Sequence, residues 1–247
     1  MLHLNRMTIA CLCAAFIAGC GNPPPEDSLS EKLADVMEEA PEPPALDIVA
    51  PELVATLDRN QLMSIMLIEL PPGVEVPEHD AGNRAVYALT DSSLLLKSED
   101  AGNVETYSVG DVDFWSPGTY GIENTGDEAA RFVVVNRTSA PLKTAIDDTT
   151  PGEEMEQPEQ VTVLHSGQNF GVERVELAPE STVSLWCDSP CSIFTLTPAT
   201  LVVDSESEEP DVMDVFGNRA VWFDGGSTWT VKSSEDPVGL VVVQLKN

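Results

Sequence analysis

The chain contains an internal duplication: displaced by 107 residues, it matches itself without a gap over two stretches. Ile68–Val76 aligns with Val175–Val183, and Tyr87–Leu96 aligns with Phe194–Val203. A repeated unit of this length, made of short apolar runs, indicates two similar β domains in one chain. Any site in one copy can therefore be compared with the same place in the other copy.

The two repeated units account for most of the chain. We expect them at residues 58–139 and 161–247, joined by an acidic linker over 140–160. Their apolar runs last four to eight residues and are separated by Gly, Pro, Asn and Asp, a pattern typical of short strands and turns. Neither unit contains a long helical pattern. The sequence therefore predicts an all-β fold with two tandem domains.

The first 19 residues have the features of a signal peptide. Arg6 supplies a positive charge, and the apolar stretch Met7–Ala18 is too short to cross a bilayer. The stretch leads into Ile17-Ala18-Gly19-Cys20, which resembles the lipobox of bacterial lipoproteins. This resemblance implies cleavage before Cys20 and attachment of lipid to that cysteine. The alternative is an ordinary secretory signal with an accidental cysteine.

A lipid on Cys20 would determine where the protein resides. More than one acyl chain gives stable anchoring, so we expect the lipid bilayer to hold the mature protein without being spanned. Gly21 follows Cys20 where an aspartate could stand, and resemblance to lipoprotein sorting then favours the outer membrane. We expect a protein of the Gram-negative cell envelope that faces the periplasm.

Residues 20–57 are expected to form an acidic, proline-rich tether between the anchor and the first domain. A capping box, Ser28-Leu-Ser-Glu31, begins an apolar pattern with helical spacing, and the Pro41-Glu-Pro-Pro44 stretch ends it. We therefore predict a short helix within the tether.

The formal net charge of −30 restricts the partners of the chain. A surface this acidic repels nucleic acid and anionic lipid headgroups. An envelope protein, or a small anionic or carbohydrate ligand, is compatible with it.

Cys187 and Cys191 are the cysteines that remain apart from the signal peptide and Cys20. An even pair in an oxidising compartment indicates a disulfide, and Pro190 helps to bend the chain between them. A redox-active or metal-binding thiol pair is the alternative, but no histidine cluster or second thiol pair accompanies it.

Two passages in the first unit resemble the motifs of the cupin superfamily of small β-barrels. Gly73-Val-Glu-Val-Pro-Glu-His79 has the glycine and the histidine that open the first motif. The passage from Gly110 to Glu128, with Pro117, Gly118 and Asn124, resembles the second motif. Through the internal repeat, the resemblance extends to the second unit. It implies two tandem cupin-like, double-stranded β-helix domains.

Catalytic members of this superfamily typically bind a divalent metal through two histidines in H-x-H, a glutamate and a third histidine. In this chain His79 takes the first of these places, but Ala81 takes the second. Arg84 or Ala85 falls near the place of the glutamate, and Tyr120 or Gly121 takes the place of the third histidine.

The second unit departs further from the metal-binding pattern. Trp186 aligns with His79 and is expected to fill the mouth of the barrel, and Ser227 to Trp229 replace the last ligand. Apart from the signal peptide, His165 is the only other histidine. Because a catalytic ion needs about three protein ligands, we expect neither unit to hold a metal or another cofactor.

We expect a candidate ligand site at the open end of the first barrel. Its residues are His79, Arg84, Tyr87, Trp115 and Tyr120, which offer polar groups and aromatic faces to a small ligand. Core packing is the alternative for Tyr87 and Trp115, since the ungapped alignment gives them the aromatic counterparts Phe194 and Trp222.

Two functional hypotheses follow from these residues. The first is a non-enzymatic binding or assembly module with no catalytic residue, in which the second unit is a scaffold or a protein-docking face. The second is a metal-independent isomerase or lyase that uses His79, with Tyr120 beside it, for acid–base chemistry.

Overall fold

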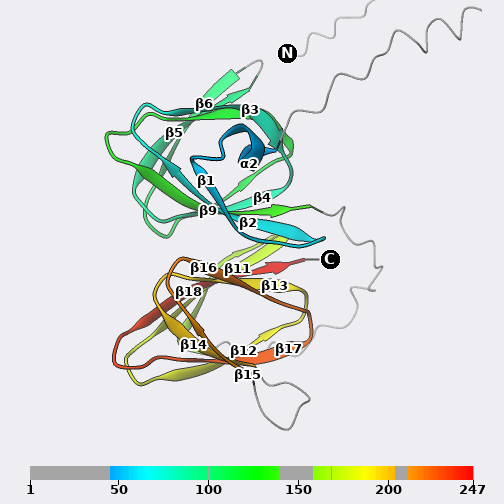
Figure 1. Cartoon of the computed structure of the whole chain (residues 1–247), viewed down its shortest axis with the longest axis vertical. Helices are drawn as coiled ribbons and strands as arrows, with labels where there is room; N and C mark the ends of the chain where they lie inside the picture. Colours follow the sequence, from blue (N-terminus) through cyan, green and yellow to red (C-terminus); the bar gives the residue numbers. More distant parts are fainter. Residues whose placement is uncertain (1–44, 99–100, 139–157, 168, 204–210, 247) are drawn as a thin grey trace, which may run out of the picture. The chain divides into compact units, whose positions relative to one another are not determined.

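A computed structural model describes residues 45–98, 101–138, 158–167, 169–203 and 211–246 (Figure 1). The expected signal peptide, Cys20, the helix of the tether and most of the linker over 140–160 lie outside these residues. No helix in the described part of the chain is long and apolar enough to cross a membrane.

The first barrel consists of two antiparallel sheets. A five-stranded sheet has the order β1-β2-β9-β4-β7, and a four-stranded sheet has the order β3-β8-β5-β6. The elements are α2 (Leu46–Val49), β1 (Val54–Arg59), β2 (Met63–Leu70), β3 (Glu75–Ala81), β4 (Arg84–Ala88), β5 (Ser92–Ser98), β6 (Ala101–Tyr107), β7 (Val112–Trp115), β8 (Gly118–Asn124) and β9 (Ala130–Arg137). The first strand thus begins four residues before the start expected at residue 58.

The second barrel repeats this arrangement. Its sheets have the orders β10-β11-β18-β13-β16 and β12-β17-β14-β15. The strands are β10 (Val161–Ser166), β11 (Phe170–Leu177), β12 (Thr182–Cys187), β13 (Cys191–Thr195), β14 (Ala199–Val203), β15 (Asp211–Val215), β16 (Arg219–Phe223), β17 (Ser227–Lys232) and β18 (Val238–Leu245). The predicted all-β fold with two tandem domains is confirmed.

Burial along the strands shows how the two kinds of sheet are covered. In β12, buried and exposed residues alternate, because one face points into the barrel and the other points to solvent. In β4 and β13 every residue is buried. Strands that are buried on both faces need apolar side chains in succession, which explains the continuous Ala-Val-Tyr-Ala and Ser-Ile-Phe runs of these two strands.

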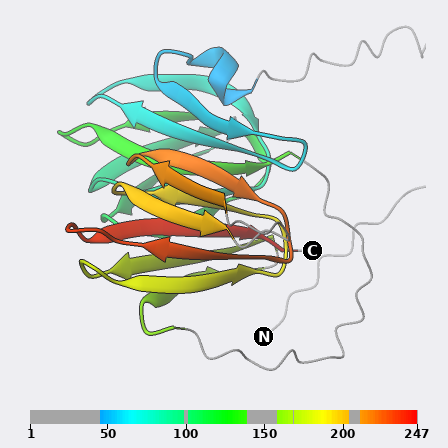
Figure 2. The ribbon, with the colours of Figure 1, turned by 60° about the horizontal axis from the view of Figure 1, so that its bottom comes forward.

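The five-stranded sheets face each other and bury a shared apolar cluster (Figures 1 and 2). We call this set the between-barrel cluster. It consists of Met63, Ile65, Ala85, Tyr87, Val133, Val135, Phe170, Val172, Phe194, Val241, Val243 and Leu245. Arg137 adds a polar contact across the boundary, since its Nη1 donates to the backbone oxygen of Lys246 at 2.8 Å. The described residues of both barrels belong to one compact unit.

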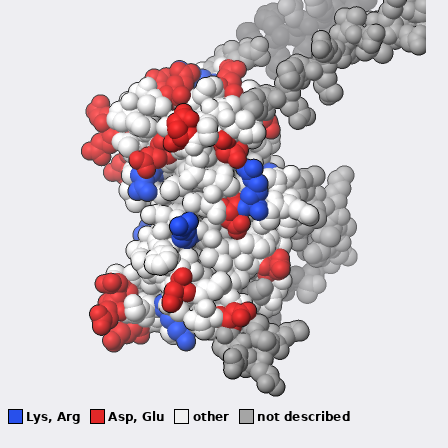
Figure 3. Space-filling model, viewed as in Figure 1, with Lys and Arg blue, Asp and Glu red and all other residues white. Residues whose placement is uncertain are grey.

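The charged residues lie outside this boundary or at its edges. Figure 3 shows Asp and Glu side chains on several separate parts of the visible face. In the first barrel, the outer face of the four-stranded sheet carries an ion-pair group, because Lys97 Nζ lies 2.8 Å from Glu75 and 2.7 Å from Glu123. These pairs are exposed to solvent, which screens their attraction, so they add little to the stability of the fold.

The two barrels differ by one residue in the register of equivalent strands. β3 has a β-bulge between Val76 and His79 in its pairing with β8, whereas β12 pairs with β17 without a shift. After the bulge, His79 lies opposite Tyr120. At the same place in the second barrel, Leu185 lies opposite Trp229.

Strand pairing corrects two matches of the ungapped alignment. Leu185, not Trp186, is the counterpart of His79, and Trp186 is 41 % exposed on the outer face of β12. The expectation that Trp186 fills the barrel mouth is therefore wrong. Likewise Trp115 points into the first barrel, whereas Trp222 packs against the between-barrel cluster. A slip of one residue moves a strand side chain to the opposite face.

The between-barrel cluster provides a test of how the two barrels stabilise each other. Val241 is 2 % exposed within the cluster, and Val104 is 57 % exposed on the edge strand β6. We expect Val241→Asp to lower the free energy of unfolding by about 3 kcal/mol, because it buries a carboxyl group without a partner. Urea denaturation measures the loss. Val104→Asp is the matched control, and an equal loss in both variants would contradict this role of the cluster.

Candidate functional site

His79 lies inside the first barrel and is 0 % exposed. The bulge in β3 directs its ring inward, where Nδ1 lies 3.0 Å from the backbone oxygen of Pro77 and Nε2 lies 2.9 Å from Nη1 of Arg84. A guanidinium can only donate, so Nε2 accepts from Arg84. Nδ1 then carries the proton of the neutral ring and donates it to Pro77. Both ring nitrogens are therefore occupied.

Arg84 begins β4 and is 2 % exposed. Besides its bond to His79, its Nη2 donates to the backbone oxygen of Asp80 at 2.9 Å. Its Nε has no hydrogen-bond partner, and among the described residues no carboxylate forms an ion pair with it. The guanidinium also lies 5.9 Å from the centre of the Tyr120 ring, within the range of a cation–π contact.

Aromatic rings surround this pair. Tyr120 meets His79 edge-on at 5.6 Å and Trp115 at 5.8 Å between ring centres. The Trp115 indole donates to the Tyr107 hydroxyl at 3.1 Å and to Asp113 at 3.2 Å, and Tyr107 donates to Asp113 at 2.8 Å. The Tyr120 hydroxyl is buried, and the Arg84 guanidinium is the charged group that interacts with it most strongly. The predicted end of the barrel is thus filled by its own side chains.

Burial controls the titration of these groups. Burial, with a smaller contribution from the positive charge of Arg84, lowers the pKa of His79 to about 4 against the opposing effects of the Pro77 hydrogen bond and Asp80. Burial raises the pKa of Tyr120 to about 12 and lowers the pKa of Arg84. At neutral pH the site therefore holds a neutral imidazole, a neutral phenol and a charged guanidinium.

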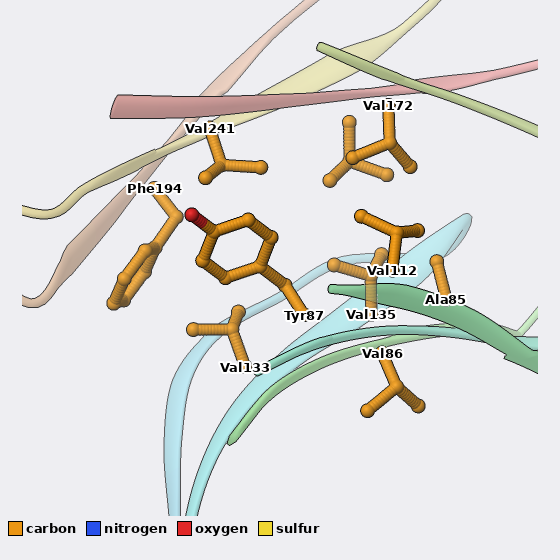
Figure 4. Close-up of a pocket in the computed structure, with 10 residues that line it drawn as sticks. Ala85, Val86, Tyr87, Val112, Val133, Val135, Val172, Phe194 and Val241 are labelled. Carbon is orange, nitrogen blue, oxygen red and sulfur yellow. The ribbon is translucent and has the colours of Figure 1, made fainter. Parts of the chain in front are cut away.

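Tyr87 lies apart from the other four predicted site residues. It points out of the first barrel into the between-barrel cluster, where Phe194 and Val241 of the second barrel lie beside it (Figure 4). A small apolar cavity there contains about 10 Å³ of free space, roughly the volume of one water-sized probe. Burial raises the pKa of the Tyr87 hydroxyl. The structure brings together His79, Arg84, Trp115 and Tyr120 but not Tyr87.

The residues at the expected metal position do not fit a divalent ion. Arg84, not Ala85, faces the interior at the place near the glutamate, because Ala85 belongs to the between-barrel cluster. Ala81 contributes no donor, and the lone pair of His79 Nε2 is taken by Arg84. Among the described residues, no group of three or more His, Cys, Asp or Glu side chains is placed to hold a metal.

The predicted disulfide is confirmed in the second barrel. Cys187 ends β12 and Cys191 begins β13, with 6.2 Å between their Cα atoms. Both residues are fully buried, and they belong to the apolar cluster inside that barrel.

Sequence reasoning did not identify a surface hollow of about 180 Å³ on the second barrel. Its lining consists of Pro198, Ala199, Thr200, Asp214, Val215, Phe216, Lys232 and Ser234. Of these lining residues, Phe216 is 74 % exposed. An exposed phenylalanine in a turn has no signal in a single sequence, because its exposure depends on how β15 and β16 are placed.

The lowered pKa of His79 makes the stability of the protein depend on pH. The unfolded chain binds a proton near pH 6.5 and the folded chain near pH 4, so the unfolded state binds more protons between these values. Stability from His79 is therefore present above pH 6.5, is lost as the pH falls, and is fully lost below about pH 4. We expect a contribution of about 3 kcal/mol.

The difference in unfolding free energy between the native chain and His79→Gln, measured from pH 7.5 to 4, tests this contribution. The difference should shrink toward low pH. If the two stability curves stay parallel throughout, the titration of His79 is not coupled to folding.

Solved structures of other proteins share this architecture. The sequence matches no family model and no curated protein. A variant of Bacillus subtilis oxalate decarboxylase with one tryptophan replaced by tyrosine is similar in structure, with a TM-score of 0.60, 10 % identity, and coverage of 78 % of this chain and 72 % of that chain. Lactobacillus farciminis oxalate decarboxylase in a formate complex gives a TM-score of 0.60 at 10 % identity, with 78 % and 80 % covered. At this identity the likeness concerns the fold, and the chain adopts the duplicated cupin fold.

Proposed function

We propose that this chain is a membrane-anchored lipoprotein of the cell envelope that acts as a non-enzymatic binding or assembly module. The observation that carries the proposal is the closed state of His79. The ring is 0 % exposed, and each of its nitrogens is already engaged in a hydrogen bond. The barrel interior that catalysis would use is occupied by the protein itself.

An isomerase or lyase based on His79 has less support. A general base must reach the proton that it removes, directly or through one water, and its pKa must be near the working pH. The pKa of His79 is lowered to about 4, and its accepting nitrogen is held by Arg84. Tyr120, the expected acid–base partner, is kept neutral by a pKa raised to about 12.

The chemistry of the structural neighbours does not transfer to this chain. One of the similar structures is a Bacillus subtilis oxalate decarboxylase, an enzyme with Mn(II) centres. Here, one inward histidine, an alanine and an arginine stand at the corresponding motif positions, and a guanidinium does not bind a metal. We therefore infer no decarboxylase activity from the shared fold.

The second barrel supplies the surface that supports a binding role. Trp186, Val212 and Phe216 are exposed to 41 %, 61 % and 74 % on or beside its four-stranded sheet. The hollow next to Phe216 is too small for a whole ligand of drug size. Its size suits one side chain of a partner, which favours an envelope protein over a sugar or an organic acid.

The anchor completes the proposal. Lipid on Cys20 and the tether over residues 20–57 would present both barrels to the periplasm, from the outer membrane in preference to the inner one. Processing that is sensitive to globomycin, and is lost in Cys20→Ala, would support lipid attachment at Cys20. Processing that continues in the presence of globomycin would contradict it.

Replacing His79 distinguishes a structural role from a catalytic one. His79→Ala should lower the free energy of unfolding by about 3 kcal/mol, because Arg84 loses a buried acceptor. The corresponding fall in Tm is roughly 6–12 °C, measured by calorimetry. The half-buried His165, whose ring centre lies 3.9 Å from that of Phe114, provides the control His165→Ala, with a smaller expected loss. An unchanged Tm together with loss of a measurable turnover would establish the enzyme hypothesis instead.

The exposed aromatic residues of the second barrel test the assembly role. We expect chemical cross-linking in intact membranes to join the native chain to an envelope protein, and Trp186→Ser/Phe216→Ser to reduce this product at least about fivefold, as for the loss of two anchor residues. Val104→Ser on the first barrel is the matched control. A thermal-shift screen with sugars and organic acids tests the alternative of a small ligand. Stabilisation by one of these compounds would contradict the assembly role and favour a small-molecule binding protein.

A further inference from the structure

We propose that the guanidinium of Arg84 in the first barrel, and the Cys187–Cys191 disulfide in the second, take the structural place of a metal ion. Each of them ties together the same two strands of its barrel. This inference goes beyond the proposed binding role, because it concerns how each barrel is closed and is independent of what the surface binds.

The His79 ring has the orientation and hydrogen bonding of a histidine that binds a metal ion. Histidines that bind metals usually donate their other ring N–H to a carbonyl or carboxylate, which fixes the tautomer. His79 does this through Nδ1 and the backbone oxygen of Pro77. The lone pair of its Nε2 then points inward, where it accepts a hydrogen bond at 2.9 Å from the cationic guanidinium of Arg84 instead of binding a metal.

The guanidinium also excludes a metal from this position. It uses the lone pair that a metal would need, and its positive charge would repel a divalent ion strongly in a site that is screened from water. Its second bond, from Nη2 to the backbone oxygen of Asp80, gives it two points of attachment on β3. Arg84 thus joins β4 to β3 as a metal held by ligands from both strands would.

This link matters because β3 and β4 belong to different sheets. β3 lies in the four-stranded sheet and β4 in the five-stranded sheet, so no ladder of backbone hydrogen bonds joins them. The same is true of β12 and β13 in the second barrel. A metal ion, an internal cation or a covalent bond can each close the barrel at this end.

Strand pairing identifies Cys191 as the counterpart of Arg84. Arg84 begins β4 and lies opposite Trp115 of β7. Cys191 begins β13 and lies opposite Phe223 of β16, and the two pairs of strands occupy the same places in their sheets.

Cys187 is the counterpart of Ala81 by the same criterion. Ala81 ends β3 opposite Gly118 of β8, and Cys187 ends β12 opposite Ser227 of β17. Two of the places where the superfamily pattern has metal ligands are therefore bridged by a disulfide in the second barrel. Leu185, at the place of His79, provides no donor there.

Rebuilding a metal site in the first barrel tests whether Arg84 takes the place of a metal ion. Ala81→His adds a second inward imidazole beside His79, and Arg84→Glu replaces the cation by a carboxylate, which together give two histidines and a glutamate as zinc ligands. The full chain without a histidine tag is purified as Ala81→His and as Ala81→His/Arg84→Glu. Each protein is stripped with chelator and titrated with Zn²⁺, with bound metal and Tm as the readouts.

We expect the double variant to bind one zinc per chain and to gain at least about 5 °C in Tm, or to require zinc for folding. Ala81→His alone should bind no zinc, because Arg84 still occupies Nε2. Equal zinc binding by Ala81→His and the double variant would overturn the proposal. A folded double variant that binds no zinc would overturn it as well.

A measurement on the native chain covers the case in which the double variant does not fold. Nitrogen NMR of the His79 imidazole should show a protonated Nδ1 and an Nε2 that accepts a hydrogen bond, and excess Zn²⁺ should leave both signals unchanged. A proton on Nε2 would overturn the proposal, because that nitrogen could not then accept from Arg84.

Hydrogen exchange separates the two links. Arg84→Met should raise amide exchange at least about tenfold in β3 and β4, whereas Cys187→Ala/Cys191→Ala should raise it in β12 and β13. Unchanged exchange in the affected pair of strands would show that the link does not hold that barrel closed. These readouts do not depend on membrane anchoring or on a partner, so they can fail while the proposed function stands.

Discussion

The packing of the two five-stranded sheets against each other is the constraint on which the rest of the structure depends. Each sheet has one face inside its own barrel and one face in the between-barrel cluster, so its central strands have little contact with water. Each barrel contains fewer than a hundred described residues and would bury a limited core alone. Shared burial explains why β4 and β13 have no exposed residue and why Tyr87 belongs to the boundary between the barrels.

The five-stranded sheet of each barrel is covered by the other barrel, so the four-stranded sheet forms the outer wall of each barrel. The four-stranded sheets carry the surface differences between the copies, with the Lys97 ion pairs on the first and exposed Trp186 and Val212 on the second. Inside, the first barrel contains a buried guanidinium and the second a disulfide. Removing one partner of a buried hydrogen-bonded charge is costly, so Arg84 and His79 depend on each other. The same fold thus supports two different interiors.

Much of the fold could be predicted from the sequence, because it depends on local patterns. Apolar runs separated by Gly, Pro, Asn and Asp predict strands and turns, and their repetition predicts two domains. The Cys187–Cys191 pair could also be predicted, since four residues of separation and a proline allow a tight turn. The grouping of His79, Arg84, Trp115 and Tyr120 was anticipated by motif positions. Its closed, self-satisfied state was not, because hydrogen bonding between β3 and β4 depends on where the sheets place them.

By itself, the amino-acid sequence determined the all-β class, the duplication and the resemblance to cupins, since each of these follows from residue order and spacing. The tertiary structure decided which face each side chain occupies. One extra residue in β3 turns His79 inward and leaves Trp186 outside, and an ungapped alignment cannot detect such a bulge. It also decided that Arg84 lies on His79, because the contact joins strands of different sheets. His79 and Trp186, which match in the ungapped alignment, therefore lie on opposite faces of their strands. The physical reason is that side chains alternate along a strand, so the register selects the face.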